Sequence, residues 1–357
     1  MKIIHTADLH LDSKMETLPA EKSKIRREEV VHTFERLADY ATKNGVSAVI
    51  ICGDMFDTSR VSIKTKGRVL QAVRSNSAVD FLYLSGNHDD FNFIESEDDL
   101  PKNLKVFGDE WTKFSYGDVV ISGVKLMGIN TKTAFDTLSL NNNDINIVAL
   151  HGQVAGYKSD KQAELISLPA LKGKHIDYLA LGHVHMRAEG VLDNRAKFAY
   201  CGCLEGRGFD ETGDKGFILL DIADGKVNSE FIKFSSRNLY EYSFDVSGKT
   251  DWYATRQEII ERLTSTFDSS SLVKLVLTGD KNADFEIDKD NLALRLNETF
   301  FFAKVYDNTK IKVEIETYAL DKTVRGEFVR EVFGSDLDEE KKSKIITCGL
   351  NALKGDK

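Results

Sequence analysis

The chain has 357 residues, 41% of them hydrophobic, so it can bury a substantial core and exceeds the usual length of one domain. No run approaches the roughly 18 apolar residues that a membrane-spanning helix needs, and the N-terminus opens on a strand pattern rather than on a signal peptide, so we expect a cytoplasmic protein. The net charge of −9 argues against a protein that binds nucleic acid through a broad basic face.

In the first half of the chain, five short polar clusters each follow an apolar run that reads as a β-strand. The expected strands lie near residues 2–7, 47–52, 80–84, 145–150 and 176–181. The clusters that follow them are Asp8-x-His10, Gly53-Asp54, Gly86-Asn87-His88-Asp89, His151-Gly152 and Gly182-His183-x-His185. Because the carboxyl ends of strands in an open α/β sheet converge, we expect these side chains to meet in one cleft. A turn or cap role is usual for one strand-end Asp, but it would have to hold separately at five places.

The first two clusters indicate how the side chains are presented. The chain is expected to leave its first strand still extended, so Asp8 and His10 should project on the same side and share one ion. Gly53 should allow a sharp turn that presents Asp54 at the end of the second strand. Since a carboxylate has two oxygens, Asp54 could bridge two ions. Carboxylate, amide and imidazole ligands without thiolate suit two divalent ions, with manganese expected and iron or zinc as alternatives.

Several residues near the clusters have roles that the sequence leaves open. Asp12 and Asp89 either orient ligand histidines or cap a turn. His5 lies inside the first strand and reads as a buried core residue. His32 and His175 read as structural or exposed, since neither belongs to a cluster.

The order of the clusters, D-x-H, GD, GNH, H and GH-x-H, resembles the signature of the calcineurin-like metallophosphoesterase superfamily. Within it, residues 3–11 and Gly53-Asp54-Met55-Phe56-Asp57 are similar to the SbcD-type DNA double-strand-break repair nucleases, and most of all to their bacterial YhaO-type relatives. The stretches 200–209 and 213–217 also resemble that subgroup. The resemblance covers about residues 1–235.

The resemblance implies two ion sites that share a bridging carboxylate, with a catalytic histidine beside them. It places Asp8, His10 and His185 at one ion, Asn87, His151 and His183 at the other, Asp54 at the bridge, and His88 as the catalytic residue. That histidine would stabilise the transition state or protonate the leaving oxygen. Two such ions can clamp a phosphodiester and activate a water molecule.

Apolar spacing predicts further elements of an α/β layered sandwich. A helix from about Ile25 to Lys43 carries apolar side chains at helical spacing, and Gly45 is a natural stop after it. Three more strands, which would complete a second sheet, are expected at 197–200, 216–222 and 226–234. For residues 1–235 the resemblance implies a four-layer α/β/β/α phosphoesterase domain.

Beyond residue 235 the strand-then-ligand pattern stops. A helix at 252–267, a strand at 272–277 and a helix at 289–297 predict a smaller α/β domain over 236–320, which the resemblance implies is a capping domain that helps to position DNA. The segment 321–357 carries two helical patterns, at 323–333 and 339–353. They either pack onto their own domain or dock onto a partner. In the wider family, a C-terminal helical region engages an SMC-like coiled-coil ATPase.

The predicted function is a metal-dependent phosphodiesterase that hydrolyses DNA, as an exonuclease or also as an endonuclease, in DNA repair. An SMC-like ATPase and a second copy of the chain are the expected partners. The alternatives are hydrolysis of nucleotides or other small phosphoesters, and a mainly scaffolding role in the ATPase complex. Thr58-Ser59 stand where phosphoprotein phosphatases carry Arg-Gly, which counts against that branch. The basic groups at 22–27 and 64–68 read as solvated helix surface.

Overall fold

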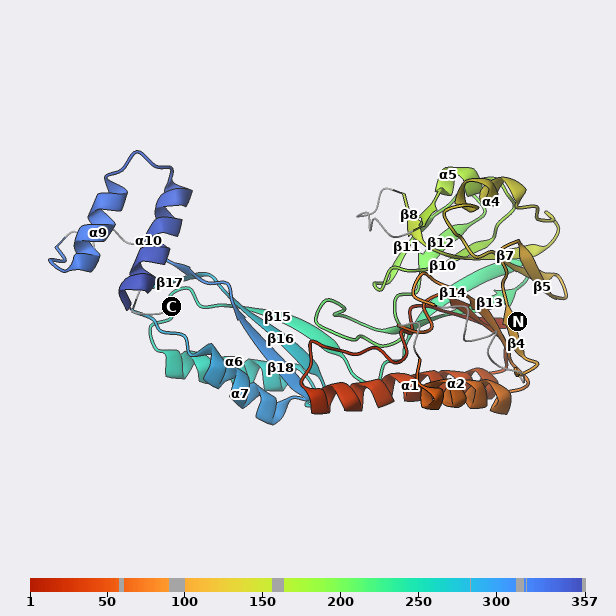
Figure 1. The fold of residues 1–357 in the computed structure, drawn as a ribbon, viewed down its shortest axis with the longest axis horizontal. Coiled ribbons are helices and arrows are strands. Elements are labelled where there is room, and N and C mark those ends of the chain that lie inside the picture. Colours follow the sequence, from red (N-terminus) through yellow and green to blue (C-terminus); the bar gives the residue numbers. More distant parts are fainter. Residues whose placement is uncertain are drawn as a thin grey trace. The chain divides into compact units, whose positions relative to one another are not determined.

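The computed structural model of the chain describes residues 1–57, 61–89, 100–155, 164–282, 284–312, 318 and 320–354. Thr58 and Ser59, which bear on the phosphatase alternative, lie outside the described residues. The chain divides into two compact units, Met1–Asn238 and Leu239–Lys357 (Figure 1). Among the helices within the described ranges, none is long and apolar enough to cross a membrane.

The first unit contains a six-stranded sheet built around the N-terminal strand. Its order is β14-β13-β1-β2-β3-β4, with β1 Lys2–Thr6, β2 Val46–Cys52, β3 Asp80–Leu84, β4 Leu104–Val106, β13 Gly216–Ala223 and β14 Lys226–Lys233. The strands β1 to β4 are parallel, whereas β13 and β14 run antiparallel to their neighbours. Asp224 and Gly225 join β13 to β14 with φ of 51° and 71°, the conformation that two-residue hairpin turns require.

A second six-stranded sheet carries the later histidine clusters. Its order is β11-β12-β10-β7-β6-β5, with β5 Thr112–Tyr116, β6 Val119–Gly123, β7 Ile145–His151, β10 Tyr178–Gly182, β11 Ala188–Val191 and β12 Lys197–Tyr200. The central strands β6, β7, β10 and β12 are parallel, and β5 and β11 run antiparallel at the edges. A separate short pair, β8 Gln153–Val154 and β9 Leu165–Ile166, follows β7.

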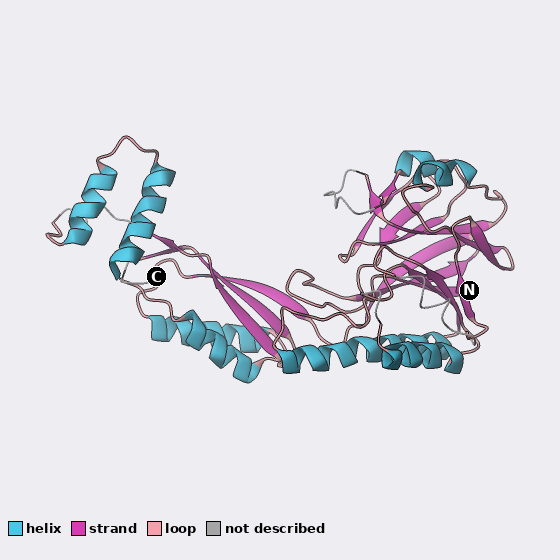
Figure 2. Ribbon diagram, in the orientation of Figure 1, coloured by secondary structure: helices cyan, strands magenta, loops and turns pink. Residues whose placement is uncertain are grey.

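Helices cover the outer faces of the two sheets (Figure 2). Side chains of both sheets, among them Ile50, Leu82 and Ile147, form one buried core between them. On one outer side lie α1 Ala20–Lys43 and α2 Ile63–Ser75, and on the other α4 Thr131–Thr137 and α5 Leu168–Leu171. The first unit therefore has the layered α/β architecture that the sequence predicts.

The first helix differs from the prediction at its start. It begins at Ala20, directly after Pro19, rather than at Ile25. Its first turn is polar and so carries no apolar periodicity to read. It ends at Lys43 as expected, and Gly45 beyond it has a φ of 65°, in the left-handed region that favours glycine.

The second unit is a smaller α/β structure. Three parallel strands, β15 Leu239–Asp245, β16 Leu272–Thr278 and β18 Phe302–Asp307, pack with α6 Trp252–Thr266 and α7 Lys289–Thr299 around one apolar core. The sequence predicted α6, β16 and α7 but neither flanking strand. A minor pair, β17 Asp280–Lys281 and β19 Lys310–Ile311, extends the unit.

The C-terminal helices pack within the second unit. The two helices, α9 Val324–Phe333 and α10 Glu339–Lys354, meet through Val329, Ile346 and Leu350, which also cluster with Ile311. This contact agrees with packing onto their own domain. The division of this region into 236–320 and 321–357, and docking onto a partner, stay predictions.

Candidate metal centre

The loops after β1 and β2 lie side by side at the ends of their strands. The backbone N–H of Asp8 donates to Gly53 O at 3.0 Å, and that of His10 to Asp54 O at 2.9 Å. Asp8 and His10 have φ of 52° and 44°, so the expectation that the chain stays extended here is wrong. The hydrogen bonds to the β2 loop impose the left-handed turn, which Asp and His tolerate better than most residues. Both side chains nevertheless reach one cluster.

Three glycines allow the loops at the strand ends to approach closely, Gly53 and Gly182 between the two sheets and Gly86 within the first sheet. A Cβ on Gly53, whose φ is 84°, would lie 2.1 Å from His151 Nδ1, so the sharp turn predicted there is present. A Cβ on Gly86 would lie 2.1 Å from Asp54 Oδ1, and one on Gly182 would lie 1.7 Å from Cys52 O. Without side chains at these positions, the neighbouring carboxylate and imidazole groups fill the space between the sheets.

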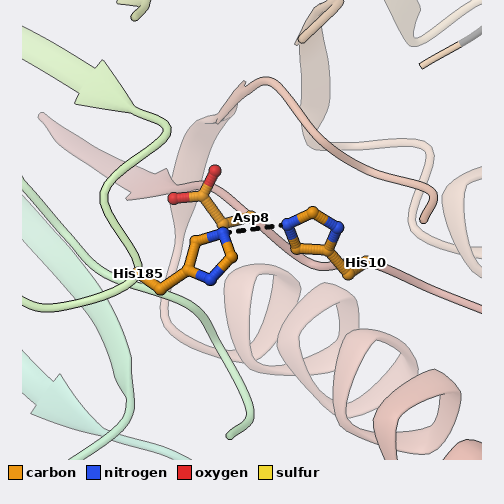
Figure 3. Close-up of side chains that lie close together, drawn as sticks. All are labelled: Asp8, His10 and His185. Carbon is orange, nitrogen blue, oxygen red and sulfur yellow. Dashed lines mark hydrogen bonds between the residues drawn. The ribbon is translucent and has the colours of Figure 1, made fainter. Parts of the chain in front are cut away.

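Asp8, His10 and His185 form the first cluster of ligand atoms (Figure 3). Their donor atoms all lie within 4.8 Å of one another, and His10 Nε2 is 3.0 Å from His185 Nε2. Nitrogen ligands about 2.1 Å from one metal ion and at right angles to each other would be about 3 Å apart. The separation of the two imidazoles therefore suits a shared ion.

Asp54, His151 and His183 form the second cluster, again with donor atoms within 4.8 Å. Asn87 belongs to it as well, because its Oδ1 lies 2.9 Å from His151 Nε2 and 3.3 Å from His183 Nδ1. His151 Nδ1 lies 2.9 Å from Cys52 O, so it carries a proton, and Nε2 is the ring nitrogen that faces the cluster. All seven residues that the sequence singled out as ligands thus lie in the two clusters.

Asp54 lies between the clusters. Its Oδ2 is 3.4 Å from His151 Nε2 and 3.8 Å from His10 Nε2. Burial by itself raises the pKa of the Asp54 carboxyl, but His151 and His10 hold that pKa well below its usual range. Burial likewise lowers the pKa of His151, yet Asp54 and Asp8 outweigh it and raise that pKa to about 9. Without a metal, protonated histidine supplies the positive charge beside Asp54. A divalent cation would take the place of that proton, so the donor set fits metal ions.

Comparison with known proteins agrees with this donor set. The family model described as calcineurin-like phosphoesterase matches residues 1–187, just over half of the chain. This chain belongs to the calcineurin-like phosphoesterase family. The resemblance read from the motifs is thereby confirmed, and the family uses divalent metals.

Three curated relatives are similar to this phosphoesterase over much of its length. It is 24% identical over 295 residues to the uncharacterized metallophosphoesterase YhaO of Bacillus subtilis, covering 78% of this chain and 72% of that protein. It is 25% identical over 340 residues to the DNA double-strand break repair protein Mre11 of Sulfurisphaera tokodaii, covering 88% and 82%. It is 21% identical over 264 residues to one subunit of the nuclease SbcCD of Staphylococcus epidermidis, covering 64% and 68%.

His88 lies outside the two clusters of the phosphoesterase, but with His10 and Asp57 it forms a third group of candidate ligand atoms within 4.8 Å of one another. Its ring centroid is 5.2 Å from that of His10, and its side chain is exposed. The backbone N–H of His88 donates to Asp54 Oδ1 at 2.9 Å. The ring is therefore anchored next to the central carboxylate and remains open to solvent.

Asp12 and Asp89 take the structural alternative that the sequence left open. Asp89 accepts hydrogen bonds from the N–H groups of Gly86 and Phe56, both at 2.9 Å, and so ties two cluster loops together. Asp12 accepts from Ser62 N at 2.5 Å and from Thr65 Oγ1 at 2.9 Å, at the start of α2. Neither carboxylate forms a hydrogen bond with a histidine of the clusters among the described contacts.

Two other carboxylates lie close to Nδ1 of the two histidines in the first cluster. Asp57 Oδ1 lies 3.0 Å from His10 Nδ1, and Glu211 Oε1 lies 2.7 Å from His185 Nδ1. In the sequence, Asp57 stood out only as part of a motif, and Glu211 was not considered. Nothing in the local pattern distinguishes Glu211, since it lies in a loop 26 positions from His185 and does not follow a strand.

The remaining histidines are where the sequence placed them. His5 is fully buried, with Nδ1 3.0 Å from Tyr178 Oη and Nε2 3.2 Å from Leu181 O. His32 and His175 are exposed.

The predicted basic helix surface is used in ion pairs between helices. Lys64 Nζ lies 2.5 Å from Glu28 Oε1, and Arg68 Nε lies 2.7 Å from Glu35 Oε1. These contacts join α2 to α1, which agrees with a solvated helix surface for residues 64–68. For residues 22–27 the prediction is wrong in part, because Arg26 is fully buried and its Nη2 lies 2.8 Å from the buried Glu205 Oε2.

Proposed function

We propose that this phosphoesterase is a dimetal phosphodiesterase that hydrolyses DNA, as an exonuclease in DNA repair. The observation that carries the proposal is the pair of ligand clusters that meet at Asp54, with an exposed histidine beside them. Phosphodiester hydrolysis requires charge neutralisation and a proton donor in one place. The ligand clusters support charge neutralisation, and His88 supports proton donation.

In this proposal the ions are held by the ligands that the sequence indicated. One site uses Asp8, His10 and His185, the other Asn87, His151 and His183, and Asp54 bridges the two. Manganese is the proposed metal, because the set mixes oxygen and imidazole ligands without thiolate. When bound, two divalent ions polarise the phosphate and activate a water molecule.

The protein groups then act around that centre. His88 is the proposed proton donor to the leaving oxygen, because it is exposed and its backbone is fixed to Asp54. Asp89 holds the loop of His88 against the loop of Asp54 through its hydrogen bonds to Gly86 and Phe56. Both loops are therefore kept in register with the ligand clusters.

The choice of DNA as the proposed substrate rests on the names of the relatives and on how much of the chain they match. The names of two of them specify DNA double-strand break repair and a nuclease, and the match to the Mre11 protein extends over 340 residues, so it reaches into the second unit. An SMC-like ATPase and a second copy of this chain are proposed partners. The hairpin of α9 and α10 is the proposed ATPase contact, with Val324 71% exposed on its first turn.

The test is manganese-dependent hydrolysis of labelled single-stranded and double-stranded DNA by the purified chain, with bis-p-nitrophenyl phosphate alongside. We expect cleavage of both DNA and the small diester, and its loss in Asp54→Ala. Cleavage of the small diester alone would support the dimetal site but contradict the proposal that the isolated chain is a nuclease. No manganese-dependent cleavage of either substrate would reject the proposed function.

A small phosphoester is the second candidate substrate. A pocket of about 380 Å³ is the size of a small-ligand site, and its lining includes Asp57, Arg207 and Glu211 but none of the three ligand residues of the first cluster. The formal net charge of −9 also fits a small substrate more easily than a polyanion. Nucleotide diesters in the same assay distinguish this candidate from DNA.

A mainly scaffolding role is tested by removing residues 321–357. We expect the shortened chain to keep hydrolysing bis-p-nitrophenyl phosphate while it loses assembly with the ATPase. If the full-length chain assembles but is inactive on every phosphodiester, the scaffolding alternative is favoured.

A further inference from the structure

One guanidinium joins the two carboxylates that stand behind the first cluster. Arg207 Nη1 donates to Asp57 Oδ1 at 2.8 Å, and Arg207 Nη2 donates to Glu211 Oε1 at 2.7 Å. The side chains are mostly buried, with 18% of Arg207, 21% of Asp57 and 4% of Glu211 exposed. This planar fork fixes the separation of the two carboxylates in a way that a lysine could not.

Each of these carboxylates contacts a different histidine of the same cluster. The oxygen atoms that meet Arg207 also lie 3.0 Å from His10 Nδ1 and 2.7 Å from His185 Nδ1. Glu211 is hydrogen-bonded to His185, so it keeps the proton on Nδ1, orients the ring and makes Nε2 a stronger ligand. The Asp57 carboxylate is at ion-pair distance from His10 Nδ1 but does not form a hydrogen bond with it. Both Nε2 atoms face each other across the first cluster at 3.0 Å.

The segment that carries Arg207 and Glu211 also holds the backbone of His185. Only 3% of Lys215 is exposed, and its ammonium donates to His185 O at 3.1 Å. The N–H of Cys203 donates to the same oxygen at 3.2 Å. His185 is thus fixed at both its ring and its main chain by residues 203–215.

The second cluster is supported differently. His151 Nδ1 meets the neutral carbonyl of Cys52 at 2.9 Å, while the carboxylate of Asp8 is 4.0 Å away, beyond hydrogen-bond distance. Asn87 contributes a neutral amide and is exposed. The first cluster combines three carboxylates, Asp8, Asp57 and Glu211, against two cations, the Arg207 guanidinium and the Lys215 ammonium. It keeps one negative charge in excess, whereas the groups behind the second cluster are neutral, so the first cluster attracts a cation more strongly.

We propose that Arg207 is a positioning residue that makes the two ion sites unequal, so that the site of Asp8, His10 and His185 fills first and holds its ion more tightly. This inference rests on the proposed dimetal function. Its physical basis is that the groups behind metal ligands typically change metal affinity by about 10- to 100-fold. The second ion would then bind at a higher metal concentration.

The experiment is a titration of the metal-free, full-length chain with Mn²⁺, with free Mn²⁺ followed by its electron paramagnetic resonance signal. We expect two binding classes that differ in affinity by at least about tenfold. Asn87→Ala should remove the weaker class alone. Arg207→Gln should weaken the tighter class about 10- to 100-fold and leave the weaker class in place.

Two further variants keep the test independent of folding. Glu211→Gln retains the side-chain volume but not the charge, and should also weaken the tighter class. Arg195→Gln is the matched control. Arg195 forms an ion pair with Asp177, which directly precedes β10, whereas His183 follows the other end of that strand. Its titration should match that of the wild type, and circular dichroism should show each variant folded.

The outcomes separate this inference from the proposed function. A wild-type chain that binds no Mn²⁺ would reject both. Two ions bound with equal affinity, or an Arg207→Gln chain in which both classes weaken equally, would reject only the role of Arg207. Selective weakening of one class in Arg207→Gln and Glu211→Gln, absent in Arg195→Gln, would support it.

Discussion

Four residues of the metal centre have a backbone conformation with positive φ: Asp8 at 52°, His10 at 44°, Asp54 at 51° and His183 at 98°. Such residues cost about 1–3 kcal/mol each and persist only where the surroundings impose them. Here the surroundings are backbone hydrogen bonds, such as His183 N to Asp8 Oδ1 at 2.9 Å. In the described part of the chain these four are half of the non-glycine residues with positive φ; the others are Asp12, Met15, His175 and Asp224.

Gly86 tests the close approach of these loops. A Cβ there would lie 2.1 Å from Asp54 Oδ1 and 2.5 Å from Asp54 N, so Gly86→Ala should displace the central carboxylate and abolish tight Mn²⁺ binding. Gly67→Ala is the control, because Gly67 lies in α2 and a Cβ added there would meet nothing within 4 Å. That variant should bind metal normally and gain about 0.5–1 kcal/mol in unfolding free energy. Normal Mn²⁺ binding by Gly86→Ala would contradict the steric account.

His88 and Asp54 should respond differently to removal. His88→Ala should keep both ions and lower turnover by about 10²- to 10⁴-fold, because only the proton donor is lost. Asp54→Ala should lose metal as well, since its carboxylate lies between the clusters. Metal content by atomic emission, measured beside turnover of bis-p-nitrophenyl phosphate, distinguishes the two. Equal metal loss in both variants would overturn the assignment of His88.

At the scale of elements, β1 connects the two sheets. Its His5 projects from the first sheet and contacts Tyr178 and Leu181 of β10 in the second. Burial lowers the pKa of His5 to about 4, with the hydrogen bond to Leu181 O opposing the shift. The neutral imidazole is therefore part of the core between the sheets.

This burial makes stability depend on pH. Between the unfolded pKa of about 6.5 and the folded pKa of about 4, the unfolded chain binds one more proton than the folded chain, so the unfolding free energy falls as pH falls. From pH 7 to pH 4.5, the metal-free wild type should lose roughly 2–3 kcal/mol more than His5→Gln, which cannot titrate. Urea unfolding at both pH values measures this difference. Parallel losses in the two proteins would show that His5 does not titrate in this range.

The apolar pattern alone does not separate the strands that were predicted from those that were missed, because the fully buried β6 was missed and β14, which has no fully buried residue, was predicted. The fully buried run of β7 is easy to read, whereas β15, with buried and exposed residues interspersed, was not identified. The polar first turn of α1 was also missed. Ser23 there is buried because its hydroxyl donates to Met15 O at 2.9 Å, a contact that periodicity does not contain.

At the scale of the whole molecule, charge limits how DNA can bind. The chain carries a net charge of −9, and Lys64 and Arg68 are paired with glutamates of α1. Arg187 offers a different position, since it is two residues after His185, its side chain is 46% exposed, and its ion pair with Glu189, at 3.8 Å, is longer than those of Lys64 and Arg68. Binding of DNA would therefore depend on few phosphate contacts, each sensitive to salt.

We expect DNA binding by the isolated chain to be weak and to fall steeply with salt. Arg187→Gln should lower the slope of log affinity against log salt by about 0.7–0.9, the value for one phosphate contact. Lys64→Gln, on an ion-paired helix surface, should leave the slope unchanged. Fluorescence anisotropy with labelled DNA at several salt concentrations measures both. Salt-independent binding would contradict DNA recognition through phosphates.

The sequence by itself determined the layered α/β class, the family and the residues that gather in the two clusters. It could do so because each ligand candidate follows an apolar strand, and strand ends at one edge of a sheet must meet. The exact ligation of metal ions stays a prediction from both sequence and geometry.

Only the tertiary structure decided which groups support those residues. Asp57 and Glu211, rather than Asp12 and Asp89, stand behind the histidines, and Arg207 joins them. Such contacts depend on where loops from distant parts of the chain come to rest, and a carboxylate has no local pattern that reveals its partner. Periodicity reports which face of an element is buried, but hydrogen bonds between loops are set by packing in three dimensions.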